Sequence, residues 1–114
     1  MIVYGIKNCD TVRKALNWLK ANNKAFEFHD YKKEGITTEK LQSWCSQVGW
    51  ENLLNRRGTT WRKLDEETRN AVTDETQAVN VMLTNTSIIK RPVIEKDGKV
   101  LMVGFDEASY SAKL

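Results

Sequence analysis

The residue with the strongest chemical signal in this sequence is Cys9, which follows a short apolar run and precedes a helical pattern. Unpaired backbone N–H groups and the helix dipole stabilise an anion at the amino end of a helix. A thiolate is such an anion, and this placement lowers a thiol pKa from about 8.5 to a range of roughly 3.5 to 7.5. We therefore expect Cys9 to be a nucleophile; the alternative is an inert, buried cysteine.

No second thiol stands next to Cys9 in the sequence. A thioredoxin-type motif has two cysteines separated by two residues, whereas positions 10 to 12 contain none. Cys45, the other cysteine, lies on the apolar side of a predicted helix, where we expect core packing; its approach to Cys9 after a movement is the alternative. The pattern favours a single-cysteine mechanism in which glutathione or a partner protein supplies the second thiol.

Arginines are the candidate anion-binding residues. Arg91 precedes a proline at the start of a predicted strand, and Arg56 and Arg57 lie in a polar loop beside Gly58. A guanidinium offers a planar set of donors to an oxyanion or a carboxylate. For each arginine the alternative is a solvated surface position.

Other polar residues near these positions carry weaker signals. Lys7 and Asn8 precede Cys9, where they can add positive charge or a hydrogen bond to the sulfur; solvated loop positions are the alternative. Pro92 is the only proline. Either its peptide bond is cis and marks a specified turn, or Pro92 is a trans proline that starts an edge strand. His29 ends a predicted strand, where we expect an edge residue rather than a general base.

A strand, a helix and a strand are predicted in the first third of the chain. Met1–Tyr4 is apolar, and Ala25–Tyr31 alternates as a second strand. The helix between them can be capped by Asp10 or Thr11 and ends at Asn22. Its apolar stripe has the spacing i, i+3, i+4 and i+7 and comprises Val12, Ala15, Leu16 and Leu19. These elements predict a βαβ unit with parallel strands.

The middle of the chain is predicted to be helical and the end to return to strands. Two apolar stripes follow a cap at Thr38 and the pair Thr73-Asp74. They comprise Leu41, Trp44, Cys45 and Val48 in the first helix and Ala78, Val81 and Met82 in the second. Pro92–Glu95 and Lys99–Val103 form a hairpin across Asp97-Gly98, and a helix from Asp106 closes the chain. We predict one α/β domain over residues 1–114, a thioredoxin-like fold with a mixed sheet flanked by helices and a helical insertion at about 36–86.

The composition excludes several classes of protein. Lys and Arg number 18 against 15 Asp and Glu, a net charge of +3, and no basic tract occurs, so we expect no nucleic-acid binding. No apolar run is long enough to cross a membrane, and Met1–Gly5 does not resemble a signal peptide, so we expect a cytoplasmic protein without membrane contact. One His and two Cys make no zinc site, and we expect no bound cofactor.

Four segments taken together resemble the glutaredoxin-dependent arsenate reductase (ArsC-like) family, and within it the Spx/YffB branch. They are Tyr4–Leu16, Asn55–Leu64, Ile88–Ile94 and Val103–Phe105. The resemblance implies a thioredoxin-like fold in which Cys9 attacks the substrate. It also implies that Arg91, together with Arg57 or Arg56, holds an oxyanion.

The resemblance leaves two functions open. The first is a glutathione-dependent reductase of a small thiol or oxyanion substrate, with glutathione or glutaredoxin as its partner. Arsenate is a doubtful substrate, because arsenate reductases carry a further arginine where Leu101–Phe105 has none. The second is an Spx-like regulatory adaptor that binds a protein such as RNA polymerase without turnover, although redox-sensing Spx members carry a cysteine pair where this chain has Cys9 alone.

Overall fold

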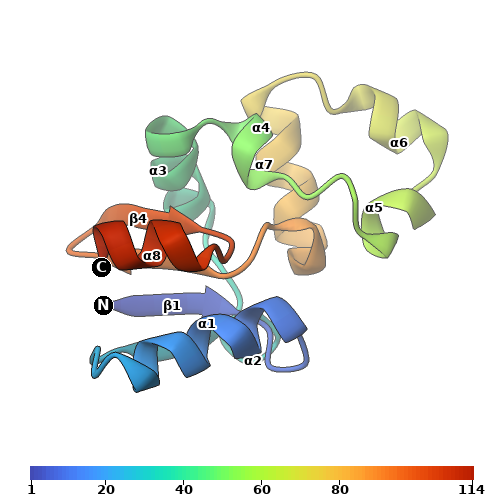
Figure 1. Ribbon diagram of the computed structural model, residues 1–114. Coiled ribbons are helices and arrows are strands. Elements are labelled where there is room, and N and C mark those ends of the chain that lie inside the picture. Colours follow the sequence, from blue (N-terminus) through green and yellow to red (C-terminus); the bar gives the residue numbers. More distant parts are fainter. The chain divides into compact units, whose positions relative to one another are not determined.

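The computed structural model describes all residues, 1–114. The chain divides into two units: residues 1–34 with 91–114, and residues 35–90. In Figure 1 the first unit is coloured mainly blue and red, and the second runs from green to orange. The second unit overlaps the helical insertion predicted at about 36–86, and the single domain stays a prediction.

A four-stranded mixed sheet forms the centre of the first unit, in the order β2-β1-β3-β4. The strands are β1 (Ile2–Gly5), β2 (Glu27–Asp30), β3 (Val93–Lys96) and β4 (Lys99–Val103). β1 runs parallel to β2 and antiparallel to β3, and β3 is antiparallel to β4. The predicted βαβ unit, the hairpin and the thioredoxin-like fold class are therefore confirmed.

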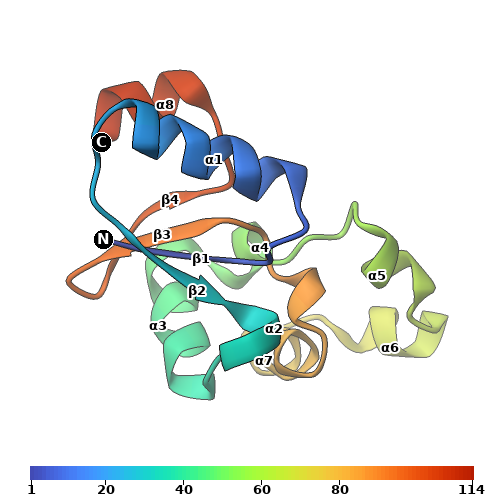
Figure 2. The same ribbon diagram turned by 90° about the horizontal axis from the view of Figure 1, so that it is seen from below.

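Two helices cover one face of this sheet. Figure 2 shows α1 (Asp10–Ala21) and α8 (Glu107–Lys113) side by side on that face. The fully buried residues between these layers are Val3, Ala15, Leu19, Ile94 and Tyr110. The ring of Trp18 on α1 meets that of Tyr110 on α8 edge to face, with centroids 5.4 Å apart. Aromatic contact therefore joins the two helices that close the core.

The hairpin turn between β3 and β4 forms where the sequence predicts it. Asp97 and Gly98 have φ values of 51° and 80°, a conformation that matches the right-handed twist of the two strands. Glycine adopts this conformation without steric cost, and aspartate is among the few other residues that tolerate it.

The second unit is helical. It comprises α3 (Thr38–Val48), α4 (Trp50–Leu53), α5 (Thr59–Lys63), α6 (Glu66–Ala71), α7 (Glu75–Thr84) and a 3₁₀ turn, η1 (Thr86–Ile88). α3, α4 and α7 pack against one another, and the apolar residues that predicted α3 and α7 are buried there, with Val48 at the edge. None of the helices in the chain has the length and apolar character needed to cross a membrane.

Some predicted boundaries are wrong by a residue or more. The hydroxyl of Thr37, not Thr38, caps α3 by accepting the Lys40 N–H, 3.1 Å away. The second strand is shorter than Ala25–Tyr31, because Tyr31 already begins the short helix α2 (Tyr31–Glu34). Of the predicted pair Thr73-Asp74, Asp74 caps α7, and its carboxylate accepts the Gln77 N–H at 2.9 Å.

Candidate functional site

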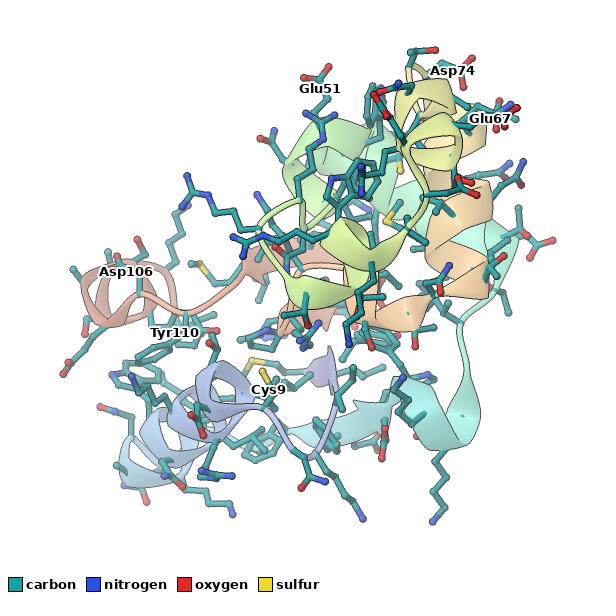
Figure 3. All side chains as sticks on the ribbon, turned by 90° about the vertical axis from the view of Figure 1, so that its right-hand side faces the viewer. Cys9, Glu51, Glu67, Asp74, Asp106 and Tyr110 are labelled. Atoms are coloured by element: carbon teal, nitrogen blue, oxygen red, sulfur yellow. The ribbon has the colours of Figure 1, made fainter.

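Cys9 is the N-cap residue of α1. Figure 3 labels its side chain where the helix begins, and its carbonyl accepts the first helical hydrogen bond, from Arg13 N–H at 2.9 Å. The predicted cap, Asp10 or Thr11, is wrong: Asp10 is the first helical residue and pairs instead with the Arg13 guanidinium at 2.9 Å. No hydrogen bond of ordinary geometry caps the helix through the Cys9 side chain. The N–H groups of the first turn act on the sulfur by favouring its thiolate form.

Two opposing effects set the pKa of Cys9. Burial of the half-buried thiol raises its pKa, because a thiolate loses solvation. Hydrogen bonds from the Val12 N–H and the Arg91 side chain, the charge of Arg91 and the Thr11 N–H all favour the thiolate. Together they outweigh burial, and the pKa of Cys9 lies below its ordinary value. Thr11 and Val12 occupy the helix positions whose N–H groups an N-cap side chain normally satisfies.

The sheet explains how Arg91 reaches Cys9. β1 and β3 are antiparallel neighbours, and Tyr4 near the end of β1 pairs with Val93 at the start of β3. The end of β1 and the start of β3 therefore lie at the same end of the sheet. Cys9 follows β1 and Arg91 precedes β3. The Arg91–Pro92 peptide bond is cis, which is the first of the two alternatives that the sequence leaves open for Pro92. Pro92 is buried, and its carbonyl accepts the Gly104 N–H at 2.8 Å. Arg91 and Cys9 are therefore positioned by the same pair of strands.

Close packing of α1 on the sheet also depends on Gly5, the last residue of β1. A methyl group at Gly5 would lie 2.9 Å from Cγ2 of Val12, one turn into α1. Real Cβ atoms do not approach other carbons so closely, so a side chain here would push the start of the helix away. Glycine at this position lets the turn that contains Cys9 approach β1.

Arg56 and Arg57 gather with a third cation inside the second unit. They line a polar pocket of about 320 Å³ with Lys90, and the carboxylate of Glu51 lies in the same lining. Arg56 stacks its guanidinium over the Trp50 ring, 5.5 Å from its centre.

The backbone holds the loop that carries these arginines. Leu54 bridges Ile89 in antiparallel fashion, and the Lys90 N–H donates to the Leu53 carbonyl at 2.8 Å. Asn55 Oδ1 accepts the Arg57 N–H at 3.1 Å. The loop is therefore tied to the segment that leads directly into Arg91 in the sequence.

The remaining candidate residues occupy less specific positions. Lys7 and Asn8 are exposed, and neither is among the groups that lower the pKa of Cys9. His29 lies on the edge strand β2, as expected, where its ring contacts that of Tyr4 at 4.7 Å. Cys45 is buried in the core of the second unit; burial and then the charge of Glu75 raise its pKa to about 11. The expected core packing of Cys45 is confirmed.

A family model described as ArsC family matches residues 4–113. The chain belongs to the ArsC family. This agrees with the resemblance carried by the segments around Cys9, Arg57 and Arg91.

Relatives of this ArsC-family chain are similar over most of its length. An uncharacterized protein of Haemophilus influenzae is 49% identical over 110 residues, which span 96% of this chain and 95% of that protein. The Global transcriptional regulator Spx of Streptococcus mutans is 28% identical over 94% of this chain and 77% of its own length.

Solved structures give the same relationship. The YffB protein is 50% identical with a TM-score of 0.92, covering 99% of this chain and 97% of its own. An arsenate reductase (ArsC) related protein from Brucella melitensis is 52% identical with a TM-score of 0.78, covering 97% and 91%.

A buried polar pair beside the site of this ArsC-family protein was not predicted from the sequence. The Tyr4 hydroxyl donates to Oε1 of Glu95 at 3.0 Å, and Glu95 is only 3% exposed. Tyr31 is buried close enough for the charges of Tyr4 and Arg91 to affect its pKa, which burial raises. The sequence carries a signal for this pair: Glu95 lies two residues after the buried Val93 and therefore on the same face of β3, and a buried carboxylate needs a partner.

Proposed function

We propose that this protein is a glutathione-dependent reductase of thiol or oxyanion substrates in which Cys9 is the only nucleophile. The observation that carries the proposal is the set of N–H and guanidinium groups around the Cys9 sulfur, which lowers its pKa. A lowered pKa increases the thiolate fraction near neutral pH, and the thiolate is the reactive form. Membership of the ArsC family, with arsenate reductase-related neighbours, supports the same chemistry.

For a disulfide substrate the reaction needs two exchange steps. The Cys9 thiolate attacks one sulfur of the substrate disulfide, forms a mixed disulfide and releases the other sulfur as a thiolate, which takes up a proton. A glutathione thiolate then attacks the substrate-derived sulfur, frees the Cys9 thiolate and leaves the substrate joined to glutathione. A second glutathione reduces that product and forms glutathione disulfide. The two electrons thus come from two glutathione molecules.

For an oxyanion substrate the arginines would stabilise negative charge. Arg91 lowers the pKa of Cys9, and Arg57 or Arg56 is the second candidate because the family resemblance places an oxyanion arginine in this loop. The segment Leu101–Phe105 contains no arginine. A dianion would therefore be less fully neutralised than in an arsenate reductase, and we expect weak or absent arsenate reduction.

Coupled turnover tests the reductase proposal. Purified protein is mixed with glutathione, glutathione reductase and NADPH, and NADPH oxidation is followed with a small glutathione mixed disulfide or with arsenate, each with and without glutaredoxin. We expect disulfide-dependent turnover that Cys9→Ser abolishes and Cys45→Ser preserves. Equal rates for wild type and Cys9→Ser would contradict the proposal.

The similarity to Spx favours a second candidate, a regulatory adaptor that binds a protein partner such as RNA polymerase without turnover. The two functions make opposite predictions for one substitution. An adaptor surface tolerates the loss of a single sulfur, so Cys9→Ser would keep partner binding and the associated phenotype. Loss of the phenotype in Cys9→Ser, with normal folding, favours the reductase.

A further inference from the structure

A groove of about 320 Å³ lies in the first unit between α1 and the strand β2. One wall is a stripe of α1 at the spacing i, i+3, i+4 and i+7, made of Arg13, Leu16, Asn17 and Lys20. None of these four residues is fully buried; the fully buried residues of α1 are Val12, Ala15 and Leu19, which face the core. The helix therefore shows a second organised face beside the one that builds the core.

The floor of the groove is apolar. Phe28 on β2 and Phe26, immediately before that strand, both line the groove. Both, together with Leu16, pack against the core on one side and remain half-buried. Apolar surface of this kind is available to the body of a ligand.

The ionised residues that line the groove are all cations: Lys7, Arg13 and Lys20. Asp10, outside the groove lining, pairs with Arg13 at 2.9 Å on an exposed surface. Arginine has five donors, so that pair leaves others for a ligand. A groove with an apolar floor and a cationic rim complements a molecule that carries an anionic group on an apolar body.

We propose that this groove binds a small organic anion, a carboxylate with an aromatic or branched aliphatic body. Its volume lies near the lower end of ligand pockets, roughly 300 to 1,000 Å³. A stable protein interface involves about 20 to 30 residues on each side, whereas seven residues line this groove, so a small molecule is the better fit. The groove begins within one helical turn of Cys9, whose carbonyl accepts the Arg13 N–H, but Cys9 is not part of its lining. Binding itself needs no thiol chemistry and does not depend on the proposed reductase activity.

Titration of the reduced, ¹⁵N-labelled protein tests the site with a set of matched probes. The probes are 4-phenylbutyrate, its neutral amide, acetate, and a tetrapeptide with acidic and apolar side chains. We expect saturable shifts in α1 and β2 with phenylbutyrate, about tenfold weaker binding of the amide, and no saturation with acetate. Equal binding of the amide or of acetate would overturn the proposal, as would binding of the peptide alone.

Substitutions locate the site. Replacing both Arg13 and Lys20 with Gln should weaken phenylbutyrate binding by about tenfold, since each exposed ion pair contributes up to about 1 kcal/mol. The control replaces Lys14 and Lys24 with Gln, which removes the same charge outside the groove lining, and its affinity should stay within about twofold of wild type. Equal losses in the two variants would show a general charge effect and contradict a built site. Circular dichroism confirms that both variants are folded.

Discussion

Arg91, the residue before a cis-proline, lowers the pKa of Cys9, the N-cap residue of α1, through side-chain hydrogen bonding and positive charge. Distant parts of the sequence meet here because β1 and β3 pair in an antiparallel register. The helix supplies two N–H groups to the thiolate and Arg91 supplies a positive charge. Both elements lower the pKa of Cys9 against the opposing effect of burial.

Replacing Arg91 with Gln should slow the reaction of Cys9 with iodoacetamide by about tenfold at pH 6. A hydrogen bond to a charged group contributes roughly 1.5 to 3 kcal/mol, and the thiolate loses that stabilisation together with the positive charge. Arg91→Lys keeps the positive charge, so its alkylation rate should fall between those of the wild type and Arg91→Gln. Rates are measured by mass spectrometry in the Cys45→Ser background. An Arg91→Gln rate equal to wild type would contradict the role of Arg91.

The stability of the protein should depend on pH through Cys9. Its pKa is lower in the folded state, whereas the unfolded thiol titrates near 8.5. Between these values the unfolded chain binds more protons, so the free energy of unfolding rises with pH, and this contribution is lost as pH falls through the folded pKa. Urea denaturation of Cys45→Ser, compared with the Cys9→Ser, Cys45→Ser double variant, measures the difference. A difference that does not grow with pH would contradict the prediction.

The two cysteines should differ strongly in reactivity. Cys45 is 4% exposed and its pKa is about 11, mainly because of burial. At pH 7.5 we expect Cys45 in Cys9→Ser to be alkylated at least about a hundredfold more slowly than Cys9 in Cys45→Ser, because both access and thiolate fraction are low. Addition of urea should remove most of the difference. Similar native-state rates would place Cys45 outside the core.

Gly5→Ala should destabilise the protein by about 1 to 3 kcal/mol, as expected for added volume in a close-packed contact. The new methyl group would lie 2.9 Å from Val12 Cγ2. Shortening the side chain of Val12 should relieve the clash. Gly5→Ala should therefore lower the free energy of unfolding by about 1 kcal/mol less in a Val12→Ala background. Urea denaturation of all four proteins gives this coupling. Simple additivity of the two changes would show that the helix does not depend on close approach at Gly5.

Tyr4→Phe should lower the free energy of unfolding by about 1 to 2 kcal/mol, because buried Glu95 loses a hydrogen-bond donor. Burial first and then the charge of Glu95 raise the pKa of Tyr4, so the hydroxyl remains a donor through the neutral range. Glu95→Gln keeps an acceptor and serves as the comparison. Unchanged stability of Tyr4→Phe in urea would show that the pair contributes little.

Local patterns in the sequence predict much of the fold. The stripe of α1, the Asp97-Gly98 turn and the Asp74 cap each depend on neighbouring residues, and each is present in the structure. The short helices α4, α5 and α6 escape prediction because they have too few residues to show a periodicity.

The site is less accessible to sequence reasoning. The position of Cys9 follows from a local strand-to-helix change, whereas its contact with Arg91 needs the pairing of β1 with β3. The Tyr4 to Glu95 hydrogen bond needs the same pairing. Such contacts depend on strand order and register, which local propensities do not specify.

The central claim, an activated Cys9 thiolate, is tested most directly by the pH dependence of Cys9 alkylation in Cys45→Ser protein. We predict an inflection clearly below the ordinary thiol value of about 8.5, with a shift toward that value in Arg91→Gln. An inflection at 8.5 or above in the Cys45→Ser protein would contradict the account and leave the regulatory adaptor as the better explanation.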